Sequence, residues 1–322
     1  MDGDHPGSSG SGLDRARPGQ RWVIRARLPD GSATDLIGWI EALAPTLRVR
    51  VDATSTVTID PRSVVLARRA PAAPGGPDPR RVPAEELERH ALPGWLAEHE
   101  PLGEWVLRAG GGFTGRANSC LAVGDPGRPI AQSAAAIREW SAAHGIEPRA
   151  QVIVGSDPDR ELTTLGWSET YVATDVMVTR LADFLGSEPP AADVRVTEEF
   201  EPAWLAAYHR SRPNDAHPAV LRAILAGNPP RAFASAGEPE LTAIARGHVS
   251  GAWLGLASIW TAPEHRRRGL ATAMMRSLGH WAARRGARYA YLQVAAANSG
   301  AIQAYERLGF RRHHSYRYLT PA

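Results

Sequence analysis

The sequence predicts an α+β protein in which a small β domain precedes a larger region of mixed sheet and helices. Three observations predict this class. Five short runs that alternate apolar and polar residues lie between residues 21 and 70. The order strand, basic turn, helix, strand, helix occupies Leu256 to Phe310. A similar order of elements occurs about 140 positions earlier. The length of 322 residues suits two or three domains.

Composition excludes several classes of protein. No apolar run approaches the length of a membrane span, and residues 1–20 are polar and lack the apolar core of a signal peptide. We therefore expect a disordered segment at 1–20 and a cytoplasmic protein. Cys120 is the one cysteine, which rules out an intrachain disulfide, and we expect it in the core.

The charge is small and carried by one basic residue type. The net charge is +3, and all 37 basic residues are arginines, so the protein has no lysine side chain of its own to modify. No basic stripe with interleaved aromatic residues occurs, so nucleic-acid binding is not predicted. We also predict no metal site and no membrane partner.

The first domain is predicted at residues 21–70. Its short strands are expected at 21–28, 36–40, 47–51, 57–59 and 64–67. Five such strands in about fifty residues are typical of a small barrel. A peptide-binding role and a structural role both remain open for it. Residues 71–82 are rich in proline and glycine and are predicted to be a linker.

The second domain is predicted at residues 83–185. A helix near Pro83 precedes strands at 104–108 and 116–123, with a glycine-rich loop at 110–115 between the strands. A helix at 129–144, a strand at 151–154, a helix from Asp157 and a strand at 171–178 follow. We interpret the glycine-rich loop as a mobile hairpin, with lining of the substrate cleft as the alternative.

The third domain is predicted at residues 186–322, after a connector at 182–190. Its first strand is expected at 194–196, its helices at 204–210 and 217–225, and its next strands at 232–235, 241–249 and 252–260. The loop between the two helices and its flanks carry polar residues that either select an acceptor or are simply solvated. These residues are His209, Arg210, Arg212, Asn214, Asp215 and His217.

The second and third domains are related by an internal repeat. Trp140 lies 141 positions before Trp281 at the end of a predicted helix, and Gly166 lies 143 positions before Gly309. Where the third domain has three arginines and Gly269, the second has the turn 124–129, which contains Asp125, Pro126 and Pro129. An aspartate repels a phosphate, and proline has no amide donor. We therefore expect the first copy to be a degenerate scaffold.

The turn Arg266 to Ala271 has the character of a phosphate cradle. It follows an apolar strand and precedes a helix marked by Leu270, Met274 and Leu278. Gly269 has no Cβ, which lets the backbone approach a ligand, and the first amides of the helix lack internal partners. Together with three arginines these amides suit a pyrophosphate.

At these residues the sequence resembles the GNAT superfamily of N-acetyltransferases. Arg266, Gly269 and Ala271 match its acetyl-CoA motif. A second motif is matched by Asn298, Tyr305, Leu308, Gly309 and Phe310. The chain is similar to actinobacterial proteins with an N-terminal SH3-like barrel and two GNAT-like units. The resemblance implies a C-terminal GNAT fold whose mixed, mostly antiparallel sheet is flanked by helices.

The resemblance also implies roles for residues. Tyr305 is the implied general acid. The implied acetyl-CoA contacts are Trp260, Thr261, Arg266, Arg267, Arg268, Gly269, Leu270, Ala271 and Asn298. The strand at 254–260 lacks the glutamate that serves some relatives as a base. A base from His209, Asp215 or His217, a water chain, and an acceptor that arrives neutral are the alternatives.

The implied activity is acetyl-CoA-dependent N-acetyl transfer to a primary amine of a small molecule or amino acid. A protein or peptide N-acetyltransferase and a non-catalytic acyl-CoA sensor are the alternative functions. The acceptor and the oligomeric state, a homo-oligomer included, stay open.

Overall fold

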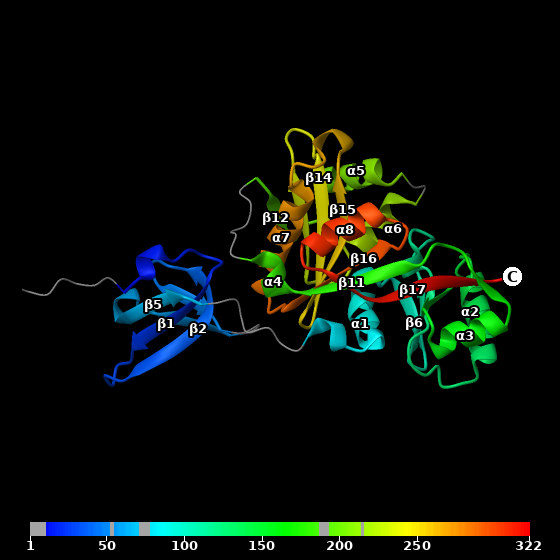
Figure 1. Ribbon diagram of the computed structural model, residues 1–322, viewed down its shortest axis with the longest axis horizontal. Helices are drawn as coiled ribbons and strands as arrows, with labels where there is room; N and C mark the ends of the chain where they lie inside the picture. The colour runs from blue at the N-terminus through cyan, green and yellow to red at the C-terminus, as the bar shows by residue number, and fades with distance from the viewer. Residues whose placement is uncertain (1–10, 52–54, 71–77, 187–192, 214–215) are drawn as a thin grey trace, which may run out of the picture. The chain divides into compact units, whose positions relative to one another are not determined.

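The computed structural model describes residues 11–51, 55–70, 78–186, 193–213 and 216–322 (Figure 1). The chain divides into two compact units. One is built by the N-terminal residues up to 70, and the other by most of the chain from residue 78 onward.

The N-terminal unit is a five-stranded antiparallel sheet in the order β4-β3-β2-β1-β5. Its strands are β1 (Arg21–Arg27), β2 (Ala33–Ala42), β3 (Leu47–Arg50), β4 (Thr56–Ile59) and β5 (Val64–Arg69). Alternate residues of β1, namely Trp22, Ile24 and Ala26, point into the core of the unit. The five strands predicted from the alternating pattern are confirmed, because each strand has one face to bury.

The disorder expected over residues 1–20 is wrong for residues 11–20. Residues 1–10 lie outside the described part, but a short 3-10 helix, η1 (Leu13–Arg15), precedes the first strand. Ala16 is fully buried in the core, and the Ser11 carbonyl accepts a hydrogen bond from the amide of Ala67 at 2.6 Å. Polar composition did not reveal this segment because its order comes from backbone pairing and one small buried side chain.

The linker expected at 71–82 lies largely outside the described residues. Its last part forms a 3-10 turn, η3 (Pro79–Arg81), which Asp78 caps by accepting a hydrogen bond from the Arg80 amide. The α1 helix (Ala84–Ala91) then begins close to the predicted position. A further 3-10 turn, η4 (Leu92–Trp95), buries Trp95 against the larger sheet.

The second unit is built on one twelve-stranded mixed sheet. Its path runs β12-β13-β14-β15-β16-β11-β17-β9-β8-β7-β6, with β10 paired to β17. Among the described strands, only the β15–β16 and β8–β9 pairs are parallel. The mixed, mostly antiparallel sheet predicted for the C-terminal part is confirmed.

The strands of this sheet come from two stretches of the chain. The first stretch supplies β6 (Glu98–Leu102), β7 (Trp105–Ala109), β8 (Cys120–Leu121), β9 (Ala150–Ile153), β10 (Trp167–Glu169) and β11 (Thr174–Arg180). The second supplies β12 (Arg195–Thr197), β13 (Arg231–Ala236), β14 (Ala243–Ser250), β15 (Trp253–Thr261), β16 (Tyr289–Ala295) and β17 (Arg311–Pro321).

The helices lie close to their predicted positions. After α1 they are α2 (Ile130–Ala143), α3 (Asp157–Thr164), α4 (Leu181–Leu185), α5 (Pro202–Ser211), α6 (Pro218–Leu225), α7 (Leu270–Ala283) and α8 (Ser299–Arg307). The helix α4 was not predicted, since its residues were assigned to a connector. It buries Leu181, Phe184 and Leu185.

The two stretches interleave their strands. Strand β11 pairs with β16 on one side and with β17 on the other, and the distal half of β17 pairs with β9 and β10 (Figure 1). The sheet is therefore continuous across the domain boundary expected at residues 185 and 186, and that boundary stays a prediction from the sequence.

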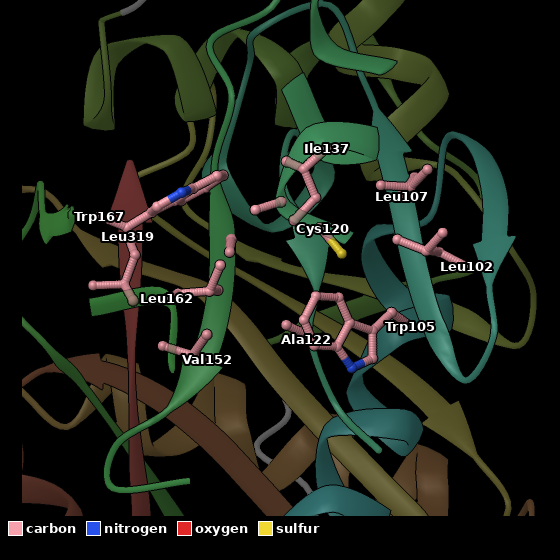
Figure 2. Close-up of a cluster of buried hydrophobic side chains, with 12 residues drawn as sticks. Leu102, Trp105, Leu107, Cys120, Ala122, Ile137, Val152, Leu162, Trp167 and Leu319 are labelled. Carbon is pink, nitrogen blue, oxygen red and sulfur yellow. The ribbon is translucent and has the colours of Figure 1, made fainter. Parts of the chain in front are cut away.

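A buried cluster packs against the sheet of the first stretch (Figure 2). Trp105, Cys120 and Ile137 come from that stretch, whereas Leu319 comes from the last strand of the chain. Burial raises the pKa of the Cys120 thiol to about 12, so the thiol stays protonated. Cys120 is thus a core residue, as predicted.

Two strand predictions in the first stretch need correction. The strand expected at 116–123 is only two residues long, because a 3-10 turn, η5 (Gly115–Ala117), occupies its beginning. The strand expected at 171–178 begins at Thr174, after the separate short strand β10.

Candidate active site

The strands β15 and β16 part at one end of the sheet. Their parallel pairing joins Trp253–Leu256 to Tyr289–Leu292 and stops there. Strand β15 nevertheless continues to Thr261 along β14, and β16 continues to Ala295 along β11. The facing backbone groups beyond Leu256 and Leu292 are therefore not used between these two strands. A ligand with amide groups can pair with such an edge.

A β-bulge in β15 marks the place where the strands part. Ile244 pairs with Trp260 and Arg246 pairs with Ala257, so Ser258 and Ile259 together face one residue of β14. Ser258 has a φ of 53°, and such bulges increase local twist. Among the described residues, the buried hydroxyls of Ser258 and Thr261 have no hydrogen-bond partner. Buried polar atoms without partners at an opening fit a ligand-binding role.

The basic turn follows directly. After a 3-10 turn, η6 (Pro263–His265), the side chains of Arg266, Arg267 and Arg268 are exposed. Gly269 has a φ of 81°, and a Cβ built on it would meet nothing within 4 Å. The positive φ favours glycine at this position, and the space around it is open to a ligand. The Arg266 Nε also donates to the Thr261 carbonyl at 3.2 Å, which ties the turn to β15.

The start of α7 completes the cradle. The first amides of a helix lack partners within the helix, and those of α7 (Leu270–Ala283) follow the basic turn directly. Free amides, a helix dipole and exposed guanidinium groups together suit a diphosphate. The predicted contacts Trp260, Thr261 and Arg266 to Ala271 thus lie in one continuous stretch at the open end of β15.

Trp260 is held from the side of α5. The Arg210 guanidinium lies over its ring, 5.9 Å from the centroid, and donates to the Leu241 carbonyl at 2.8 Å. Arg210 is also paired with Glu240 at 2.9 Å. Of the polar residues predicted around the α5–α6 loop, Arg210 therefore packs on Trp260, one of the predicted acetyl-CoA contacts.

Asn298 and Tyr305 come from the second motif. The Asn298 Oδ1 accepts a hydrogen bond from the Ala301 amide at 3.1 Å and so caps α8. Tyr305 is half-buried, and its ring packs edge-on to Phe310 at 6.2 Å. Burial raises the pKa of Tyr305, and the charge of Arg212 partly opposes this. The phenol therefore keeps its proton at neutral pH.

The three side chains predicted as possible bases differ in their surroundings. The His217 Nδ1 caps α6 by accepting a hydrogen bond from the Ala219 amide at 3.2 Å, which occupies the nitrogen that a base would use. His209 is half-buried near the end of α5, and Asp215 lies outside the described residues.

A cavity of about 620 Å³ opens beside this end of the sheet, and none of its lining residues is among the catalytic and acetyl-CoA-binding residues predicted from the sequence. Thr174 lines the cavity and pairs with Ala295, the last residue of β16. The glycine-rich loop also lines the cavity. Further lining comes from two arginines and four aromatic rings, namely Arg116, Arg149, Phe113, Tyr171, Tyr316 and Tyr318.

The glycine-rich loop is pinned, which corrects its interpretation as a mobile hairpin. The buried Asn118 side chain accepts from the amides of Gly110 and Gly112 and donates to the carbonyls of Gly110 and Thr114. A Cβ on Gly111 would lie 3.0 Å from Val220 of α6, so the loop packs closely on that helix. The alternative reading, in which the loop lines a cleft, agrees with the cavity.

In the first stretch, the turn that corresponds to the basic turn is occupied by the Glu104 side chain. The Asp125 amide donates to the Glu104 carboxylate at 2.7 Å, and a Cβ on Gly124 would lie 2.3 Å from the same carboxylate. Two acidic side chains at this turn oppose a phosphate. This arrangement agrees with the expectation that the first copy is degenerate.

No helix among the described residues is both long and apolar enough to span a bilayer. No group of three or more histidine, cysteine or acidic side chains in the same residues is arranged to hold a metal ion.

Comparisons with known proteins agree on one family. The family described as "Probable histone acetyltransferase Rv0428c C-terminal" matches residues 84–319, and its "N-terminal Sm-like domain" matches residues 16–68. The Mycobacterium tuberculosis protein named "Probable histone acetyltransferase Rv0428c" is 29% identical over 311 residues, which are 94% of each chain.

Two further similarities are more limited. The Bacillus subtilis "Uncharacterized N-acetyltransferase YobR" is 38% identical over 80 residues, which cover 24% of this chain and 32% of that protein. A solved structure described as a GCN5-related N-acetyltransferase from Kribbella flavida has a TM-score of 0.53 at 17% identity, and the match covers 74% of this chain and 95% of that one. This structure supports the fold alone.

Proposed function

The chain belongs to the family of the probable histone acetyltransferase Rv0428c, within the GNAT superfamily of N-acetyltransferases, and from this premise we propose that it transfers acetyl from acetyl-CoA to the primary amine of a small molecule or amino acid. We also propose which residues bind acetyl-CoA and which residue protonates the departing thiolate.

One observation carries the proposal. The parting of β15 and β16 leaves a backbone edge next to the basic turn and the first turn of α7, whose amides lack partners within the helix. These two features together offer amide partners for an extended arm and positive charge for its diphosphate. Acetyl-CoA has both an arm with amide groups and a diphosphate, so its chemistry fits the residues present.

Each residue has a distinct task in this proposal. Arg266 to Ala271 bind the diphosphate, and the backbone of Trp260 and Thr261 orients the arm. A backbone amide of the parted strands stabilises the negative charge that develops on the carbonyl oxygen. Tyr305 holds its proton on Oη and gives it to the departing thiolate. The acceptor amine must be neutral when it attacks.

The first test is a calorimetric titration of the purified protein with acetyl-CoA and, separately, with CoA. We expect one site per chain with a dissociation constant on the order of micromolar. Gly269→Glu should abolish this binding, because the new carboxylate faces the diphosphate and the backbone angle is strained.

Gly166→Glu is the matched control. Gly166 has a φ of 86° and also meets nothing within 4 Å, but it lies at the end of α3. This variant should keep the wild-type affinity at a similar cost in stability. Retained binding in Gly269→Glu would place the diphosphate elsewhere, and two sites per chain would contradict the degenerate first copy.

A protein acceptor is the second candidate function. It is favoured by the name of the Mycobacterium tuberculosis relative, which is similar along 94% of its length. The N-terminal unit would then help to hold the acceptor. Removal of residues 1–77 should in that case reduce transfer to a histone peptide and leave transfer to a small amine unchanged.

A further inference from the structure

We propose that the amine acceptor also carries a carboxylate, and that Arg116 binds this carboxylate in the cavity beside the open end of β16. The inference rests on the proposed function, because it names the acceptor class of the same site. It adds a specificity-determining residue that lies outside both GNAT motifs.

The cavity lies next to the opening between the strands. Thr174 lines it and pairs with Ala295 at the end of β16 and with Tyr316 in β17. The guanidinium of Arg116 acts electrostatically on Tyr291, which lies in the last part of the β15–β16 pairing. An acceptor held at Arg116 is therefore close to the strands that would present the acetyl group.

Arg116 is held in place but is not neutralised. Its Nε donates to the Tyr316 hydroxyl at 3.0 Å, and its guanidinium lies over the Trp95 ring at 5.1 Å. Within the described residues it forms no ion pair with a carboxylate. Arg116 is half-buried and only its Nε is used in the described chain, so an anionic ligand at its two terminal nitrogens would be stabilising.

The nearby carboxylates are engaged with other groups. Glu147 pairs with Arg149, which also lines the cavity. Glu88 acts on Arg116 electrostatically, but its two oxygens accept hydrogen bonds from Gln151 and pair with His314 at 2.7 and 3.0 Å. The cavity therefore keeps surplus positive charge at Arg116, which opposes a cationic acceptor segment.

A second arginine in the lining, Arg149, supports the same conclusion. Arg149 stacks on the rings of Tyr171 and Tyr318, at 5.1 and 5.8 Å from their centroids. Its buried Nε has no hydrogen-bond partner among the described residues. A second guanidinium with an unused donor thus lines the cavity. An α-amino acid carries its amine and its carboxylate on the same carbon, which suits a small site.

The test compares phenylalanine with phenylalaninamide, which differ in the charged group. Binding to the full-length protein is measured by calorimetry, and acetyl transfer is measured as release of free thiol from acetyl-CoA. We expect wild type to prefer phenylalanine by at least tenfold in both readouts. Arg116→Met should lose this preference, Arg116→Lys should keep part of it, and Arg128→Met, at an exposed arginine, should keep all of it.

The possible results distinguish a failure of the Arg116 inference from a failure of the proposed acetyl transfer. Equal use of the acid and the amide by wild type, or a preference that persists in Arg116→Met, would overturn the inference while leaving acetyl transfer intact. Carboxylate-dependent binding without any transfer would support the cavity and overturn the proposed function. If Arg116→Met does not fold, Tyr316→Phe serves instead: it removes the hydroxyl that orients Arg116, and an unchanged preference there would count against the inference.

Discussion

Tyr305 shows what a single half-buried phenol contributes to the proposed site. Its ring packs on Phe310, and burial keeps its pKa raised, so that it holds a proton when a thiolate leaves. Gly309, with a φ of 89°, ends α8 just beyond it. The residue therefore has the protonation state that the proposed role of general acid requires.

Tyr305→Phe should lower turnover by roughly 100-fold or more while acetyl-CoA binding persists. The variant removes only the proton donor, and the packing on Phe310 remains. The control is Tyr289→Phe, since the Tyr289 hydroxyl is buried without a hydrogen-bond partner in the described chain. Unchanged turnover in Tyr305→Phe would show that another group protonates the thiolate.

His248 links stability to pH. It is buried on β14, and burial first, then the charges of Arg246 and Arg231, lower its pKa from 6.5 to about 4. The unfolded chain therefore binds a proton at higher pH than the folded chain does. The contribution of neutral His248 to the free energy of unfolding is therefore full above about pH 6.5 and is lost as the pH falls toward 4.

Urea unfolding of wild type and His248→Gln at several pH values measures this contribution. The free energy of unfolding of wild type should fall by roughly 3 kcal/mol more than that of the variant between pH 7 and pH 4. Other titrating groups are shared by the two proteins and cancel. Parallel pH profiles would mean that His248 titrates normally in the folded state.

At the scale of elements, the β15–β16 pair is the feature that defines the site. The pair must be tight up to Leu256 and open beyond it, and Gly255 makes the tight part possible. A Cβ on Gly255 would lie 2.3 Å from the Tyr291 hydroxyl, which belongs to the facing residue of β16. The absent side chain lets the Tyr291 ring cross the neighbouring strand.

Gly255→Ala should lower the free energy of unfolding by about 1–3 kcal/mol, because the added methyl group overpacks this contact. Gly300→Ala is the matched control: Gly300 lies in the first turn of α8 and a Cβ there meets nothing within 4 Å. That change should be neutral or slightly stabilising. Denaturant unfolding of the two variants gives both values, and equal stabilities would refute the contact.

At the scale of the whole chain, the interleaved strands make the two GNAT-like stretches depend on each other. Strand β17 supplies Leu319 to the core of the first stretch and Tyr316 to the wall of the cavity. Strand β11 of the first stretch separates β16 from β17. The cavity is consequently lined by both stretches. A degenerate first copy can therefore still shape the site of the second.

Local patterns in the sequence determined much of this protein. The alternation in residues 21–69, the turn at Gly269 and the start of α7 were all predicted from a few neighbouring residues. Backbone angle, capping and the periodicity of apolar residues are properties of short segments, so a single sequence displays them.

Only the tertiary structure decided the remaining features. Strand β17 was not predicted, and its partners lie in three different parts of the chain. The hydrogen bond between Arg116 and Tyr316 joins residues 200 positions apart, and the parting of β15 from β16 is a difference between neighbours in the sheet. Such features depend on which distant segments meet, and that choice is made by burial and pairing over the whole chain rather than by any local pattern.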